Sequence, residues 1–480
     1  MTAQTILPAN STTGGFEVSN SCRFDSASEQ TLEKTQSAGN RNTATFSAWI
    51  KRTELSSNLA FFAIYGAQSD AGQIEIRFNG TGDGLQIGGY ATVWEKTSAS
   101  FKDISAWYHV VVAIDTTDST ANDRIKIYVN GVLQAAAATG DLAEDEDLPF
   151  GLNNADVVIG SRKMSGGLRD FFSGYMAEVV LIDGAALAPT SFGEFDSDSG
   201  IWRPIDVSGL TFGTNGFYLD FKVSANLGND ANGGTDLGET NIAAVDQSTD
   251  TCTNNFATLN PLFNSAALAQ TPVLSEGNLN FAATSSGSHG ASSVATLAPS
   301  SGKWYWETKQ TATVANGFAS GVRVLEGYNP TAADDSSFYG DNSTFGGFGY
   351  GYSYNAGHVL HNAQFGTTNR GNGVSPDDIV GHALDLDNGA FYFSINGTFQ
   401  ASGDPTSGAS KTNAQHSFTV DGSYAPAVYG YSSAVFQMNF GSPMHSISSG
   451  NADANGHGNF EFAVPSGYFA LNTKNLSEYG

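Results

Sequence analysis

Hydrophobic and polar residues alternate with a period of two along most of this chain. In the stretch QIEIRF at 73–78, apolar residues take every second position and polar residues take the others. The stretches at 44–52 and 124–129 repeat this pattern. Such alternation is typical of antiparallel strands with one face in a core and the other toward solvent. No stretch predicts an amphipathic helix of three turns, and 189–192 is the best candidate for a short helical turn.

Two strand pairs predict tight hairpins and an internal correspondence. Asn-Gly stands at 130–131 and again at 396–397, each time between strand-like runs. Asn-Gly accepts the positive φ that both positions of a type I′ turn require. The segments 112–134 and 382–400 share the order strand, Asp-rich turn, strand, Asn-Gly and strand ending in Gln. The fold class is therefore all-β, with two antiparallel β-sandwiches of related topology in tandem.

Chain length and local composition set the expected domain boundaries. A chain of 480 residues exceeds a single core. The stretch 226–250 is rich in Gly, Asn, Asp and Thr and marks a boundary. We expect an N-terminal arm at 1–14, a first sandwich at 15–221, a connector at 222–255 and a second sandwich at 256–480.

The charge balance narrows the classes of partner. The chain has 47 acidic and 21 basic residues, for a net charge of −26. Such a surface repels phosphate backbones, so we expect no nucleic-acid role. No stretch approaches the ~20 apolar residues of a membrane span, so we expect no membrane insertion. Residues 1–15 contain no basic segment and no apolar run, so we expect synthesis in the cytoplasm without a signal peptide.

The two cysteines, Cys22 and Cys252, lie far apart and neither belongs to a metal-type pair. We expect two free thiols that behave as small hydrophobic residues. The alternative is a disulfide that ties the first domain to the connector. The lack of a disulfide framework fits synthesis in a reducing cell.

Catalytic motifs are missing from the sequence. Glycosidases of the jelly-roll class place paired carboxylates across a sugar. The nearest approach here is Glu194 and Asp196, but Asp198 and Ser199 follow where a second Glu should stand. There is no nucleophile elbow and no phosphate loop. We therefore expect a protein that is not an enzyme.

Metal sites receive little support from the residue spacing. His358 and His361 are three apart in a predicted strand, which puts them on opposite faces and disfavours joint zinc ligation. Hard oxygen ligands crowd one turn, at Asp115, Asp118, Asn122 and Asp123, and would suit calcium. The same residue types also form ordinary turns, so we expect no cofactor and leave calcium open.

Aromatic residues are the best candidates for ligand binding, because exposed Trp and Tyr offer large rigid surfaces to sugar rings. In the first domain, Tyr90 and Trp94 flank a polar loop. In the second domain the candidates alternate along one strand or follow in the next turn, and they are Tyr350, Tyr352, Tyr354, His358 and His361. The alternative is that these aromatic residues line the cores.

Five stretches of the first domain carry a family resemblance: FSAWIKR, AWYHVVVAID, RIKIYVNG, VVIGS and FSGYMAEVVLIDGAAL, which start at residues 46, 106, 124, 157 and 172. In their order they resemble the laminin-G-like branch of the concanavalin-A-like jelly rolls. The resemblance implies a lectin-like sandwich, and domains of this branch often carry calcium. The second domain resembles a SPRY domain in GKWYWE, VGHALDLDNGAFYFSING, YAPAVYGY and MNFGSP, which start at residues 302, 380, 424 and 438.

The pairing of these domains resembles surface proteins of tailed bacteriophages, as do the segments at 191–204, 213–221, 253–262 and 465–476. The resemblance implies a virion surface protein, such as a tail fibre, receptor-binding, head fibre or decoration component. It would bind host-surface glycans or other virion proteins, and a homo-oligomer would gain strength by avidity. The alternatives are a purely structural cement protein and a polysaccharide hydrolase.

Overall fold

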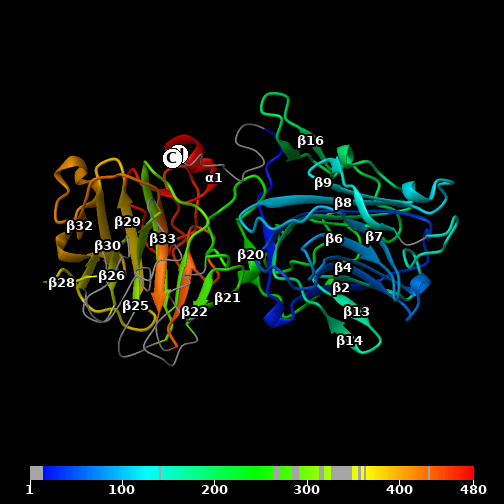
Figure 1. The fold of residues 1–480 in the computed structure, drawn as a ribbon, viewed down its shortest axis with the longest axis horizontal. Coiled ribbons are helices and arrows are strands. Elements are labelled where there is room, and N and C mark those ends of the chain that lie inside the picture. The colour runs from blue at the N-terminus through cyan, green and yellow to red at the C-terminus, as the bar shows by residue number, and fades with distance from the viewer. Residues whose placement is uncertain are drawn as a thin grey trace. The chain divides into compact units, whose positions relative to one another are not determined.

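The computed structural model describes residues 15–139, 142–263, 271–283, 291–312, 318–325, 349–354, 358–361, 364–430 and 433–480. These residues form two compact units, one ending at Asn255 and the other starting at Phe256. Both units consist mainly of antiparallel strands (Figure 1). The prediction of an all-β, two-sandwich fold is confirmed.

The first unit contains two large sheets, each named here by a central strand. The β3 sheet runs in the order β10 (Val132–Leu133), β9 (Ile125–Val129), β8 (Trp107–Asp115), β3 (Thr43–Arg52), β15 (Gly174–Asp183), β1 (Ser21–Phe24) and β20 (Gln247–Ser248), and β18 (Phe217–Leu219) also pairs with β15. The β5 sheet runs in the order β11 (Ala136–Thr139), β7 (Val93–Thr97), β6 (Leu85–Gly88), β5 (Gln73–Phe78), β4 (Leu59–Tyr65), β12 (Asp156–Ile159), β2 (Thr31–Thr35) and β19 (Gly238–Thr240). In Figure 1, β8 and β9 lie above β4 and β6, as two layers of a sandwich.

The core of the first unit is built from the apolar positions of the alternating strands. Phe46 and Ile50 of β3, Val112 of β8, and Ile74 and Ile76 of β5 are buried in one cluster. Burial of side chains of this size stabilises the fold by about 1.5–3 kcal/mol each. Two small hairpins lie outside the two large sheets: β13 (Arg162–Met164) with β14 (Gly167–Arg169), and β16 (Gly193–Phe195) with β17 (Trp202–Pro204).

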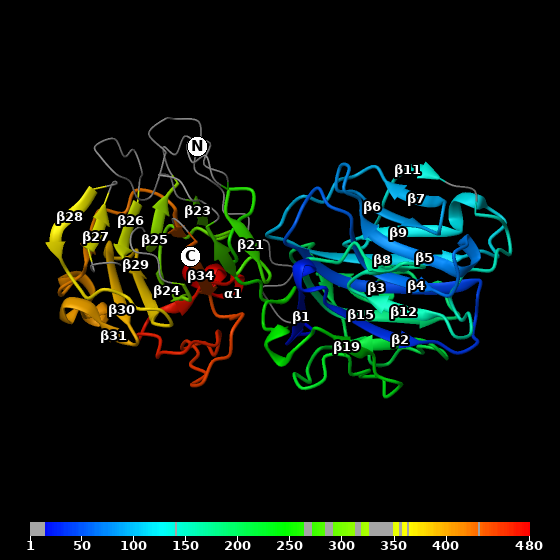
Figure 2. The same ribbon diagram turned by 90° about the horizontal axis from the view of Figure 1, so that it is seen from below.

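The described residues of the second unit also form two large sheets, and Figure 2 labels many of their strands. One runs β21 (Val273–Ser275), β22 (Asn280–Ala282), β34 (Val435–Asn439), β24 (Lys303–Gln310), β29 (Ile379–Asp385), β30 (Ala390–Ile395) and β31 (Thr398–Phe399), with β32 (His416–Ser417) on β30 and β35 (Phe469–Ala470) on β24. The other runs β23 (Ala291–Val294), β33 (Tyr424–Gly430), β25 (Phe318–Val324), β26 (Gly349–Ser353), β27 (His358–His361) and β28 (Gln364–Asn369).

Helical segments are short. Within the described ranges, the 3-10 turns are η1 (Ser26–Ser28), η2 (Asp70–Gly72), η3 (Ala121–Asp123), η4 (Pro189–Ser191), η5 (Ala244–Asp246), η7 (Gln400–Ser402) and η8 (Pro405–Ser410), and the α-helix is α1 (Thr473–Tyr479). The turn expected near residue 189 is therefore present. Among the described residues, no helix has the length and apolar composition needed to cross a membrane.

The two Asn-Gly turns have the backbone that the sequence predicts. Asn130 and Gly131 have φ of 49° and 77°, and Asn396 and Gly397 have φ of 47° and 76°. Each asparagine also ties its hairpin to the facing strand through its side chain. Oδ1 of Asn130 accepts from the backbone N–H of His109 at 2.8 Å, and Oδ1 of Asn396 accepts from that of Ile379 at 3.0 Å. The two units therefore share one hairpin design.

The segment 222–255, expected to be a connector, differs from that expectation because it folds onto the first unit. Strand β19 pairs with β2 in the β5 sheet, and strand β20 pairs with β1 in the β3 sheet. Asp246 forms a buried ion pair with Arg23 at 2.9 Å. A buried arginine needs a paired and hydrogen-bonded acidic partner, and this polar segment supplies it.

Candidate functional site

The two aromatic candidates of the first unit differ in solvent exposure. Trp94 is only 3 % exposed and belongs to the main core, so its assignment to a ligand site was wrong. The alternation of β7 turns this indole toward the core, where its large apolar area is best buried. Tyr90 is 41 % exposed and remains a candidate.

Tyr90 is held in place by the loop between β4 and β5. The amide Nε2 of Gln68 donates to the Tyr90 hydroxyl at 2.6 Å. Asp70 accepts from the backbone N–H of Ala91 at 3.0 Å and from the Thr92 hydroxyl at 2.8 Å. An exposed ring fixed in this way loses little conformational entropy when it binds a ligand.

A row of polar side chains runs from this loop across the outer face of the β5 sheet. Gln73 pairs with Tyr65, Tyr65 pairs with Asp156, and Asp156 pairs with Thr35 in the register of neighbouring strands. Their apolar neighbours in sequence, such as Ile74 and Val157, face the core. Residues that share a face and a row lie about 5 Å apart, so the row is continuous.

Gln73 is the unusual member of this row. It is 1 % exposed, and neither its Oε1 nor its Nε2 has a hydrogen-bond partner within the described residues. Buried polar groups in folded proteins are almost always hydrogen-bonded, so an unpaired amide at this place requires an explanation. We define the Tyr90 surface as Tyr65, Gln68, Asp70 and Tyr90, with Gln73 buried next to Tyr65. The alternation had placed Gln73 on the polar face but gave no signal that it would be buried.

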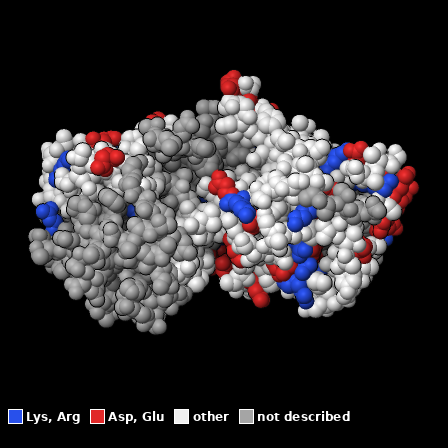
Figure 3. Space-filling model, in the orientation of Figure 1, with Lys and Arg blue, Asp and Glu red and all other residues white. Residues whose placement is uncertain are grey.

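Charged residues next to this row are already paired. Lys163 bridges Glu33 and Asp156 at 3.1 and 3.0 Å. Arg162 pairs with Glu75 at 2.9 Å. On the face shown in Figure 3, acidic and basic side chains of the first unit are interspersed and no broad basic area forms. That pattern and the net charge of −26 disfavour a polyanionic ligand.

The tyrosine candidates of the second unit line the core instead of a ligand site. Tyr352 and Tyr354 are buried in the main cluster, which corrects their assignment. The Tyr352 hydroxyl donates to the backbone oxygen of Asn372 at 2.6 Å, and the Tyr354 hydroxyl lies 2.7 Å from Ser320 Oγ. Partnered hydroxyls allow these large rings to be buried at low cost.

Tyr350 is half-buried and stacks on Phe418 with ring centroids 4.3 Å apart. The remaining two candidates, His358 and His361, have side chains outside the described residues. The second unit therefore offers no described aromatic platform comparable to Tyr90.

The acidic turn at 115–123 is built from local contacts. Oδ1 of Asp115 accepts from the backbone and the hydroxyl of Thr117, and Asp123 pairs with Lys126 at 3.1 Å. Oδ1 of Asp118 accepts from the backbone N–H of Thr120. These oxygens serve their own turns, as Asx residues commonly do, and do not converge on one point. The described residues contain no group of three or more His, Cys, Asp or Glu side chains placed to hold a metal.

The carboxylates nearest to a glycosidase pattern belong to a salt-bridged hairpin. Arg203 pairs with Glu194 at 2.8 Å and with Asp196 at 2.6 Å. Hydrogen bonds from Ser199 and Asp198, together with the charge of Arg203, lower the pKa of Asp196. A glycosidase acid needs a raised pKa, so this pair is poorly suited to that role.

Both cysteines are free and buried. Burial raises the pKa of each thiol well above its usual range. These thiols are therefore structural rather than reactive.

Comparison with known proteins finds a family model that is similar to part of the first unit. Residues 24–190 match the Laminin_G_3 family model, described as the concanavalin A-like lectin/glucanases superfamily. No curated protein matches this chain.

Three solved structures are similar in part. A native heptameric SAP-like pentraxin from Limulus polyphemus is 16% identical over 36% of this chain and 80% of its own, with a TM-score of 0.29. The SPRY domain of human HERC1 is 16% identical over 39% of this chain and 99% of its own, with a TM-score of 0.27. A protein from Bacteroides ovatus described as carbohydrate binding is 18% identical over 47% of this chain and 60% of its own, with a TM-score of 0.34.

Proposed function

We propose that this chain is a non-enzymatic carbohydrate-binding protein and that the Tyr90 surface is its binding site. The observation that carries the proposal is an exposed tyrosine whose hydroxyl is held by Gln68 and whose following residues are held by Asp70. The match of residues 24–190 to the lectin and glucanase superfamily supports the same class of ligand.

The chemistry of the Tyr90 surface fits a sugar. Pyranose rings present apolar C–H faces that pack on aromatic rings, and their hydroxyls both donate and accept hydrogen bonds. Tyr90 and Tyr65 supply the aromatic surface. The exposed amide of Gln68 and the partly exposed carboxylate of Asp70 supply the polar groups beside the Tyr90 ring.

The biological setting is the finer part of this proposal. The paired sandwiches and the segments at 191–204 and 465–476 resemble those of tailed-bacteriophage surface proteins. We therefore place the protein on a virion surface, made in the host cytoplasm, where it binds host polysaccharide and neighbouring virion proteins. A single shallow sugar site is weak, so a homo-oligomer would gain affinity through avidity.

A glycan array and a host-cell binding assay test the sugar site with the purified full chain. We expect Tyr90→Ala to reduce binding at least tenfold, because the ring supplies most of the contact area. Phe195→Ala is the matched control, since Phe195 is a similarly exposed aromatic residue that packs on Trp202, away from the Tyr90 loop. Equal loss in both variants, or no binding by an oligomeric preparation, would contradict the proposal. Release of reducing ends from a bound polysaccharide would point instead to a hydrolase.

A structural role is the second candidate, and exposed apolar residues favour it. Val132 and Leu133 of edge strand β10 are more than half exposed, as is Phe195 of the β16–β17 hairpin. Gly131 lies against the ring of Trp202, which brings these two hairpins together. Exposed apolar patches of this kind mark contacts with other proteins. If Leu133→Asp abolishes incorporation into particles while glycan binding persists, the patch is a virion contact.

A further inference from the structure

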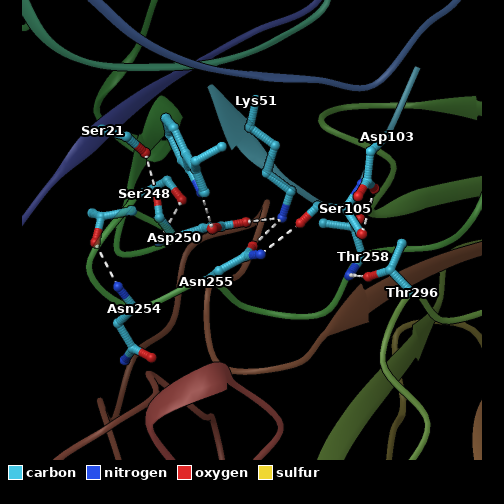
Figure 4. A network of polar contacts seen from close by, with 12 residues as sticks. Ser21, Lys51, Asp103, Ser105, Ser248, Asp250, Asn254, Asn255, Thr258 and Thr296 are labelled. Atoms are coloured by element: carbon cyan, nitrogen blue, oxygen red, sulfur yellow. Dashed lines mark hydrogen bonds and ion pairs between the residues drawn. The ribbon is translucent and has the colours of Figure 1, made fainter. Parts of the chain in front are cut away.

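A buried lysine, aspartate and asparagine meet on the outer side of the β3 sheet (Figure 4). Nζ of Lys51 lies 2.7 Å from Oδ2 of Asp250 and 2.7 Å from Oδ1 of Asn255. All three residues are at most 1 % exposed. Lys51 comes from β3, whereas the other two come from the segment that follows β20.

The surroundings hold this triad rigidly and keep it dry. Trp107 Nε1 donates to Oδ1 of Asp250 at 3.1 Å, and the Lys51 ammonium lies 5.6 Å from the ring centroid of Tyr175. Nδ2 of Asn255 donates to the backbone oxygen of Ser105 at 2.6 Å. The amide carbonyl is thereby turned toward the lysine, while its nitrogen points away from it.

We propose that Lys51 and Asn255 become joined by an intramolecular amide bond, with Asp250 as the acid–base group. Asp250 takes a proton from Nζ along the contact between them, which gives a neutral amine. Nζ then attacks Cγ of Asn255, and the bond from Cγ to Nδ2 breaks. Nζ gives up a second proton as the amide forms. Asp250 relays both protons to the departing nitrogen, which leaves as ammonium, so the step balances without any oxidant or co-reactant.

The arrangement favours this reaction for physical reasons. A nucleophile fixed beside a carbonyl reacts as if at very high concentration, because the entropy of bringing the two groups together has already been lost on folding. The buried position of the three residues excludes the water that would compete for the carbonyl. A lysine amine that is activated by a neighbouring base is a known form of covalent nucleophile.

The intact mass of the purified full chain is the first test. We expect a mass below that of the sequence by one ammonia, about 17 Da. A cyclised Asn-Gly pair would lose the same mass, so the digest decides between them. The amide bond predicts a branched peptide that contains Lys51 and Asn255, with no cleavage after Lys51. A folded chain with its full sequence mass and no branched peptide would overturn the proposal.

Variants separate the chemistry from a purely structural role. Lys51→Arg keeps a cation beside Asp250 but removes the nucleophile, so the branched peptide should disappear. Asp250→Asn should leave both reacting groups and reduce the yield of branched peptide at least tenfold, with folding checked by circular dichroism. Lys222→Arg is the control, because Lys222 pairs with Asp220 at 3.1 Å on an exposed surface. Full linkage in folded Asp250→Asn would remove Asp250 from the mechanism.

Discussion

Trp202 and His109 are joined by a buried hydrogen bond, in which the indole Nε1 donates to Nδ1 of the imidazole at 2.9 Å. Nδ1 must therefore be unprotonated, so Nε2 carries the hydrogen and donates to Ser47 Oγ at 2.9 Å. Trp49 stacks on the same ring at 4.6 Å. The neutral tautomer of His109 is thus fixed from both sides by residues of the β3 sheet and the β16–β17 hairpin.

This environment predicts acid sensitivity of the first unit. Burial lowers the pKa of His109 from 6.5 to about 3. Between these values the unfolded chain binds a proton that the folded chain does not, so stability falls as pH drops below 6.5. We expect a loss of about 1.4 kcal/mol per pH unit. Hydrogen exchange of β8 amides at several pH values measures it, and His109→Gln should flatten the slope; an unchanged slope would contradict the assignment.

Glu178 predicts the opposite dependence on pH. Burial raises its pKa from 4.5 to about 7, while Tyr218 donates a hydrogen bond to it at 2.5 Å. A raised pKa in the folded state means that its stabilisation is complete below pH 4.5 and is lost as pH rises through 7. We expect the parent chain to lose about 3 kcal/mol of unfolding free energy through Glu178 as the pH rises past 4.5 and 7, and Glu178→Gln to lack this loss. Denaturant titrations at several pH values in that range measure the difference. Parallel curves for variant and parent would refute the prediction.

The glycine at the first hairpin is required by a neighbouring ring. A Cβ on Gly131 would lie 2.4 Å from the Trp202 ring, at a φ of +77°. We expect Gly131→Ala to destabilise the first unit by about 1–3 kcal/mol through overpacking and strain. Gly200 has a similar φ of +69° with nothing within 4 Å, so Gly200→Ala isolates the effect of strain. Equal destabilisation of both variants would show that the contact with Trp202 has no effect.

Replacing Trp94 and replacing Tyr90 should have very different effects on the stability of the first unit. Trp94→Ala removes a core side chain and should cost about 3–5 kcal/mol. Tyr90→Ala changes an exposed side chain and should stay within about 0.5 kcal/mol. Thermal denaturation of both variants provides the comparison. A large loss of stability in Tyr90→Ala would mean that this ring is structural and would weaken the sugar-site proposal.

The two thiols should not react with alkylating reagents in the native protein. Because Cys22 and Cys252 are buried with raised pKa values, we expect no reaction with iodoacetamide at about pH 8 until the chain is denatured. Mass spectrometry of native and denatured samples gives the number of labelled cysteines in each. Native labelling of either residue would show that its segment opens readily.

Local patterns were enough for the strands and hairpins, because alternation and Asn-Gly turns depend on neighbouring residues. They were not enough for the candidate site. Tyr90 and Trp94 lie four residues apart beside the same loop, and only their packing shows that one is exposed and the other buried. Tyr352 and Tyr354 share a face as the alternation implies, but which face meets the core depends on the opposite sheet.

The burial of Lys51 is the clearest feature that the sequence alone did not predict. By itself the sequence determined that β3 alternates, and so that Lys51 lies on the face opposite Phe46 and Ile50. Solvent was the natural expectation for that face. Only the tertiary structure decided that residues 248–255 return over the sheet and bury Lys51 with Asp250 and Asn255. The reason is physical: strand periodicity is a local property, whereas burial of a charge depends on a partner about two hundred residues away.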